Sequence, residues 1–210
     1  MNKYDFKACD PIKTSTVVLI TYTAIIGFIH GVGEIFQAGS QATSNMIYAL
    51  NVADPSEVWH GGLPAFTLTP NFLISGILTI LISIAIVIFV NLLIESKYFI
   101  FILLIFIPLF LFGGGFIPPF IGIMSGTYYA ILKRSNMNTV KPTLLRKLVA
   151  QLWIYLISAL ILWLPSSWII GWIFPVFRLQ ISSVTFIVFD LFLPFLILTA
   201  ANSKYRIASN

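Results

Sequence analysis

Apolar residues run in long, nearly unbroken stretches through most of this chain, and short polar segments separate the stretches. Four of these stretches cover residues 15–36, 71–94, 148–164 and 181–201. Each has, or nearly has, the roughly 20 residues that a helix needs to cross the apolar core of a bilayer. The pattern therefore predicts an all-α membrane protein, because a soluble helix would alternate its apolar positions with polar ones.

The stretch over 98–132 is too long for a single span, and its middle is broken. Three consecutive glycines at 113–115 precede two prolines at 118–119. Glycine has a low helix propensity, and proline lacks an N–H donor and has a fixed φ. We therefore expect two short helices, over 98–112 and 118–132, joined by a tight turn. This interpretation brings the number of spans to six.

The basic residues test this number, because the cytoplasmic loops of membrane proteins are enriched in Lys and Arg. With six spans and a cytoplasmic N-terminus, eleven of the twelve Lys and Arg residues lie on the cytoplasmic side, and only Arg178 lies outside. With five spans, the basic segment 133–147 would lie on the opposite side from the basic N-terminal tail. The distribution therefore favours six spans with both termini in the cytoplasm.

This topology divides the chain into one bundle and its flanking segments. We expect a cytoplasmic tail at 1–14, a single helical bundle over 15–201 and a second cytoplasmic tail at 202–210. A 34-residue outer loop at 37–70 would connect the first two spans, with a short interfacial helix over 43–50.

Composition agrees with a location in the cell membrane. The chain is 59% hydrophobic and 9% charged, whereas a soluble domain carries about 25% charged residues. The net charge of +5 does not indicate nucleic-acid binding, because the basic residues lie in short runs beside apolar segments. We expect the lipid bilayer as the main partner and no nucleic acid. Cys9 is the only cysteine, which excludes an internal disulfide and a Cys-rich metal motif.

Small residues recur at every fourth position in two predicted helices. Gly27 and Gly31 do so in the first helix, and Gly122, Gly126 and Ala130 do so in the fourth. Such stripes let a second helix approach closely, which matters because lipid provides no hydrophobic drive for helices to associate. We expect packing within the bundle, and docking of a partner membrane subunit or a second copy is the alternative.

Three ionisable residues lie inside predicted spans and away from their ends, namely His30, Glu34 and Asp190. A carboxylate at mid-bilayer costs about 2.5–3.5 kcal/mol on insertion scales, so such residues usually face the bundle interior. His30 and Glu34 are four residues apart and share a helix face. Asp190 precedes Pro194 by four residues, and Pro194 cannot donate to the Asp190 carbonyl. A broken helix of this kind is typical of transporter sites, although a plain proline kink explains it as well.

Three functions fit these residues. The first is binding or transport of a small solute or ion in an outward-facing polar pocket, where His30 and Glu34 bind the substrate or a proton and Asp190 and Arg178 assist. All four belong to the first and last spans or their outer ends, so we expect these two spans to be neighbours that share one polar site. The outer loop would then act as a lid.

The second hypothesis is a membrane-embedded enzyme that holds a divalent metal through His30, Glu34 and His60, since two His and one carboxylate suit Zn²⁺ or Fe²⁺. No other cofactor is expected. The third is a structural or accessory subunit that docks through its small-residue stripes. The sequence contains no nucleophile elbow, P-loop, dinucleotide fingerprint or HExxH motif, so binding or transport is favoured over catalysis.

Overall fold

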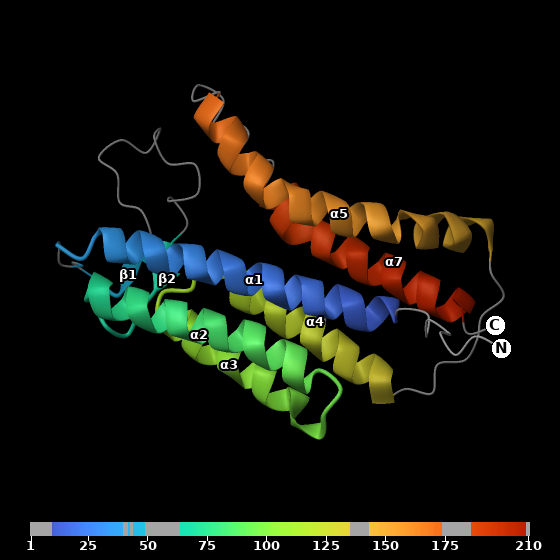
Figure 1. Cartoon of the computed structure of the whole chain (residues 1–210), viewed down its shortest axis with the longest axis horizontal. Helices are drawn as coiled ribbons and strands as arrows, with labels where there is room; N and C mark the ends of the chain where they lie inside the picture. Colours follow the sequence, from blue (N-terminus) through green and yellow to red (C-terminus); the bar gives the residue numbers. More distant parts are fainter. Residues whose placement is uncertain are drawn as a thin grey trace, which may run out of the picture.

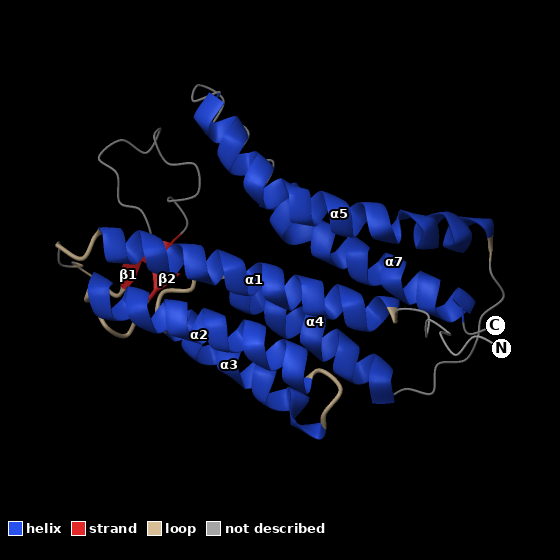
Figure 2. Cartoon of the chain, in the orientation of Figure 1, coloured by secondary structure: helices blue, strands red, loops and turns tan. Residues whose placement is uncertain are grey.

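The chain is built mainly from long helices that run along one common direction, as the computed structural model shows (Figures 1 and 2). The structure describes residues 10–39, 42, 44–48, 64–134, 143–173 and 186–208. The helices are α1 (Pro11–Phe36), α2 (Phe72–Leu93), the 3-10 turn η2 (Lys97–Phe99), α3 (Ile100–Leu111), α4 (Ile117–Arg134), α5 (Leu144–Ile173), the π-helix η4 (Phe186–Phe192) and α7 (Leu193–Ala208).

In this described part of the chain, helix covers most of each of the six segments predicted as spans. The predicted end of the fifth span at 164 is wrong, because α5 continues through Pro165 to Ile173. Three helices are long and apolar enough to cross a membrane: α1, α2 and the Leu144–Ser166 part of α5. The segment Lys97–Leu111 is a shorter apolar helix. The prediction of a mostly helical protein with membrane-compatible helices is therefore confirmed.

Two short strands are an exception to the all-helical prediction (Figure 2). Strands β1 (Met46–Tyr48) and β2 (Pro64–Phe66) pair antiparallel, with Ile47 opposite Ala65. The expected interfacial helix over 43–50 is therefore wrong, because its centre is extended. Ile47 and Ala65 are buried together with Phe72 at the start of α2. This apolar contact holds the strand pair against the helical bundle.

Helix α1 lies at the centre of the fold (Figure 1). It contacts α2 and α4, and it also contacts α7, while α5 packs mainly on α7. The predicted adjacency of the first and last spans is therefore confirmed. Apolar side chains from all of these helices fill the space between them, and the fully buried ones include Leu19, Ile20, Ile86, Phe106, Leu160 and Ile197.

Helices α1 and α2 meet where two glycines face each other. A side-chain carbon at Gly31 would lie 2.8 Å from the Gly76 carbonyl oxygen, and one at Gly76 would lie 2.6 Å from the Gly31 carbonyl oxygen. No Cβ atom fits at such distances, so the two backbones touch directly. Gly27 lies one turn earlier against Ser83 of α2 and Leu109 of α3. The stripe in the first helix is therefore occupied by neighbouring helices of the same chain.

The stripe in α4 is also covered from within the chain. Gly122 lies against the ring of Phe106, and Gly126 lies against Leu103, both on α3. Ala130 packs at the edge of the same apolar core. Because small-residue stripes allow close helix contact in lipid, these positions explain how two short helices joined by a tight turn pack together.

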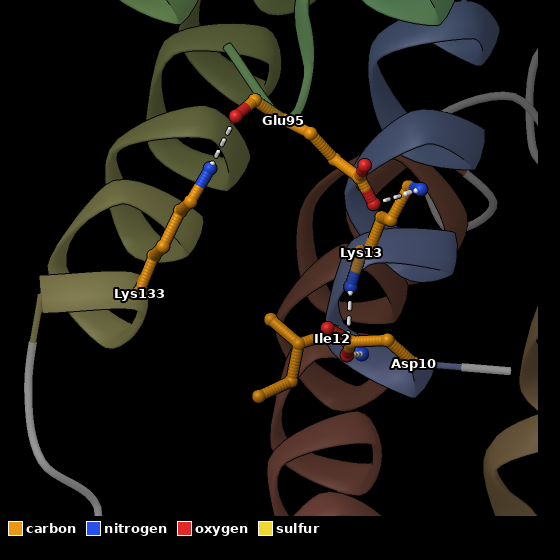
Figure 3. A network of polar contacts seen from close by, with 5 residues as sticks. All are labelled: Asp10, Ile12, Lys13, Glu95 and Lys133. Carbon is orange, nitrogen blue, oxygen red and sulfur yellow. Dashed lines mark hydrogen bonds and ion pairs between the residues drawn. The ribbon is translucent and has the colours of Figure 1, made fainter. Parts of the chain in front are cut away.

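Charged residues gather at one end of the bundle (Figure 3). The Asp10 carboxylate caps α1 by accepting from the N–H groups of Ile12 and Lys13, at 2.9 and 3.2 Å. Lys13 forms an ion pair with Glu95, and Lys133 donates to the Glu95 carbonyl oxygen at 2.8 Å. The contacts tie the start of α1 and the end of α4 to the segment after α2, although exposed ion pairs add little stability.

All of the Lys and Arg residues that the structure describes flank helix ends on this same side of the bundle (Figure 1). We call this side the basic end. Its members are Lys13, Lys97, Lys133, Arg134, Arg146, Lys147, Lys204 and Arg206.

The contact between α1 and α2 predicts the effect of adding one methyl group. Gly31→Ala is expected to lower the free energy of unfolding by about 1–3 kcal/mol, because the new Cβ meets backbone atoms that cannot move aside independently. Gly39→Ala is the matched control, since no atom of the described residues lies within 4 Å of its added carbon. Unfolding of both variants in detergent measures the difference, and equal stabilities would contradict a direct backbone contact.

Candidate functional site

Gly113, Gly114 and Gly115 lie in the turn between α3 and α4, at the end of the bundle opposite the basic end. We call this segment the glycine turn. Gly113 has φ +103° and Gly115 has φ +79°, a region that side chains other than glycine rarely enter. Gly113 and Gly115, two of the three glycines that predicted a tight turn, are thus required by its backbone conformation. Gly114 is required by close contact, since a side-chain carbon there would lie 2.6 Å from the Leu109 carbonyl oxygen.

The glycine turn packs directly on His30 and Glu34. A side-chain carbon at Gly113 would clash with the Glu34 carboxylate, lying 2.8 Å from its Oε2 atom. One at Gly115 would lie 3.1 Å from Cε1 of the His30 imidazole. The absence of side chains on the turn therefore provides the space that both polar groups occupy, and the structure brings this predicted pair together on one face of α1.

The Glu34 side chain is fully buried, with an exposed fraction of 0%. Within the described residues, neither carboxylate oxygen has a hydrogen-bond partner. Ser75 of α2 lies beside the carboxylate, but its hydroxyl donates to the Phe112 carbonyl at 2.7 Å. The Thr79 hydroxyl bonds the same carbonyl oxygen. The neighbouring hydroxyl groups thus bond the carbonyl of Phe112 at the end of α3. The buried carboxylate oxygens of Glu34 can still accept hydrogen bonds or a proton.

His30 lies one helical turn from Glu34, or about 6 Å along the axis at 1.5 Å per residue. Its exposed fraction is 4%. One imidazole nitrogen can accept a proton while the other donates one. A carboxylate and an imidazole at this spacing can therefore exchange a proton or share a small cation.

The segment after β2 closes this end of the bundle. The N–H of Leu68 donates to the Leu111 carbonyl at 2.9 Å, and Thr67 forms a β-bridge with Phe112. The hydroxyl oxygens of Thr67 and Ser75 are 3.0 Å apart. Neither Thr67 nor Ser75 was among the predicted site residues, although Ser75, Thr79 and Ser83 recur at every fourth position of α2. That spacing is the signal that could have identified a polar face.

Asp190 lies in a separate polar contact. The Tyr22 hydroxyl donates to Asp190 Oδ1 at 2.7 Å, and the two side chains are 5% and 7% exposed. Tyr22 precedes Glu34 by twelve residues, or about 18 Å along α1. The structure therefore does not bring Asp190 to the His30–Glu34 pair, and the last span contributes to a second polar position.

The backbone around Asp190 is a π-helix rather than a plain kink. The π-helix η4 ends at Phe192, directly before the turn that contains Pro194. Proline lacks the N–H that an α-helix would use at this position, and wide turns of this kind absorb such a break. Phe189 in η4 stacks on Trp163 of α5, with ring centroids 4.2 Å apart. Asp190 thus lies in a widened helix whose side chains contact Tyr22 of α1 and Trp163 of α5.

Two predicted site residues, His60 and Arg178, lie outside the described residues. The metal site formed by His30, Glu34 and His60 therefore has no geometry to support it. Within the part of the chain that the structure describes, no group of three or more His, Cys, Asp or Glu side chains could hold a metal ion.

The contact between Glu34 and the glycine turn predicts coupled effects on stability. Gly113→Ala should destabilise the protein more than Gly115→Ala, because both strain φ but only the first clashes with a carboxylate. The double variant Gly113→Ala, Glu34→Ala should recover part of the loss, with a coupling energy of about 0.5–3 kcal/mol. Unfolding of the single and double variants in detergent measures this energy. Strictly additive effects would contradict the direct contact.

Compared with protein-family models, with curated proteins and with solved structures, the chain matches none. The geometry around Glu34 is therefore the basis for proposing a function.

Proposed function

We propose that this protein crosses the cell membrane six times, with both termini in the cytoplasm. The basic end supports this topology, because it collects the described Lys and Arg residues where the positive-inside rule expects the cytoplasm. Large exposed apolar side chains on α2, α3 and α5, such as Leu81, Ile107 and Leu162, would face lipid. The short helices α3 and α4 require tilting or local thinning of the bilayer.

The single cysteine offers a direct test of this orientation. Cys9 lies two residues before the start of α1 in the sequence, in the segment that the proposed topology puts in the cytoplasm. A membrane-impermeant maleimide should therefore label it only after the cells are permeabilised. A cysteine introduced at Gly39 in a Cys9→Ser background should give the opposite result and serves as the control. Labelling of Cys9 in intact cells would contradict a cytoplasmic N-terminus.

We propose further that Glu34 binds and transfers a proton, with His30 as its exchange partner. The observation that carries this proposal is the fully buried Glu34 carboxylate, whose two oxygens have no hydrogen-bond partner among the described residues. An unpaired charge in an apolar interior costs several kcal/mol, so the group must gain a cation or a proton to be stable there. The proposal therefore follows from electrostatics.

The size of the ligand follows from the packing. The carboxylate lies against the Gly113 backbone and is closed off from solvent. A ligand that adds no volume suits this position better than a solute of several atoms, which favours a proton. In the proposed topology the glycine turn faces outward, so protons would reach Glu34 from the outer side. The contacts of Thr67 and Leu68 with the end of α3 would then form the inner part of the predicted lid.

Reconstitution into vesicles that contain a pH-sensitive dye tests this function. Under a membrane potential, the unmodified protein should carry protons, Glu34→Gln should lower the rate at least tenfold, and His30→Ala should lower it less. Glu95→Gln removes an exposed carboxylate at the basic end and should leave the rate unchanged. A Glu34→Gln protein that carries protons at the full rate, or transport of Na⁺ in place of protons, would contradict the proposal.

A further inference from the structure

Buried polar residues continue from Glu34 along one face of α1 toward the basic end. Thr16, Thr23, His30 and Glu34 are spaced by seven, seven and four residues, which places them within an arc of about 40° on a helix with 3.6 residues per turn. All four are buried. Thr16 and Glu34 are about 27 Å apart along the axis, which is close to the thickness of the bilayer core.

Helix α2 presents a matching row. Ser75, Thr79 and Ser83 are spaced by four residues and are all buried. The Ser83 hydroxyl points at α1, since a side-chain carbon on Gly27 would lie 2.9 Å from its oxygen. Ser83 therefore occupies the level between Thr23 and His30. We call the two rows together the polar seam, and its members are Thr16, Thr23, His30 and Glu34 of α1 with Ser75, Thr79 and Ser83 of α2.

The hydrogen bonding of the seam is incomplete. In the described part of the chain, the hydroxyl oxygens of Thr16 and Ser83 have no hydrogen-bond partner. The same is true of the two carboxylate oxygens of Glu34. Hydroxyl groups in apolar helices usually bond a carbonyl of the preceding turn, as Ser125 does to Gly122 at 3.1 Å. Within the seam, the Thr23 hydroxyl donates in this way to the Ile20 carbonyl at 2.8 Å, so Thr16 and Ser83 are its unbonded hydroxyls. Buried water molecules commonly satisfy groups left without such a bond.

We propose that the polar seam is a water-lined proton path between Glu34 and the basic end. This inference rests on the proposed function of Glu34 and adds the route by which the proton leaves it. A proton passes from Glu34 to His30, one helical turn away, when a water molecule or a side-chain rotation bridges the two groups, and then to water beside Ser83. Thr23 and Thr16 border the remaining water column. For each proton that Glu34 accepts, one is released at the basic end, so the charge of the path is restored after every cycle.

The spacing of the seam defines the number of water molecules needed. The level of Ser83, at Gly27, is eleven residues from Thr16, or about 16 Å along α1. A chain of roughly five or six water molecules at ordinary O–H···O distances spans this gap. The Tyr22–Asp190 contact lies outside the path, because Tyr22 is rotated about 100° around α1 from Thr23.

Transport by variants of the seam tests the path. Ser83→Ala and Thr16→Val should each lower proton transport at least fivefold in reconstituted vesicles. Neither should lower the unfolding temperature, because each removes a hydroxyl that lacks a partner. Ser125→Ala is the matched control: it removes an equally buried hydroxyl that is bonded within its own helix, and transport should stay unchanged.

A second measurement separates the path from the Glu34 site. Infrared difference spectra on a pH jump should show the carbonyl band of a protonated Glu34 in Ser83→Ala and Thr16→Val, and this band should vanish in Glu34→Gln. If both seam variants carry protons at the full rate while Glu34→Gln does not, the path is wrong and the site stands. If Glu34→Gln transports normally, the proposed function itself fails.

Discussion

The direct contact between the backbones of α1 and α2 is the constraint on which the rest of the structure depends. In lipid, apolar surfaces gain little by meeting each other, so helices associate through close packing and interhelical hydrogen bonds. Gly31 and Gly76 allow the shortest possible approach of the two helices. This approach places Ser75 beside Glu34 and Ser83 beside Gly27, and it closes both polar rows away from lipid.

Glu34 and Asp190, the buried acids among the described residues, are stabilised differently, and this difference separates structural from functional chemistry. Asp190 accepts a hydrogen bond from Tyr22, which joins the α7 side of the bundle to α1. The Trp153 indole adds a second link by donating to the Ser15 hydroxyl at 2.7 Å. The Ser75 hydroxyl lies beside the Glu34 carboxylate but bonds the Phe112 carbonyl, and neither Glu34 oxygen has a hydrogen-bond partner among the described residues. A buried carboxylate that accepts a hydrogen bond from another helix holds the two helices together, whereas a buried carboxylate that accepts no hydrogen bond keeps its affinity for a proton.

The sequence predicted features that depend on local pattern. Apolar length marked the six helical segments, the run Gly113–Gly115 marked the turn, and the spacing of His30 and Glu34 placed them on one face. Features that depend on distant partners were not predictable. The pairing of Tyr22 with Asp190 joins residues 168 positions apart, and the role of Gly76 exists only because Gly31 faces it. Periodicity describes one helix and carries no information about which helix lies opposite.

The pairing of the two strands illustrates the same limit. An isolated apolar stretch near 43–50 fits a short helix as well as a strand, and only the distant partner at 64–66 makes the extended form favourable. Residues 113–115 show a further case. Their helix-breaking character predicts a turn, but the reason for having no side chain at Gly113 is the Glu34 carboxylate on another helix.

The arrangement of the two ends gives the proposed path a direction. Glu34 lies at the glycine turn, outward in the proposed topology, and the seam runs from there to the basic end. A charge that crosses the whole membrane gains about 2.3 kcal/mol per 100 mV of potential. Because the seam covers about 27 Å, most of the change in electrical potential across the membrane falls along the seam, and little of it falls at Glu34. Proton capture at Glu34 would then depend mainly on outer pH, and movement along the seam mainly on the potential.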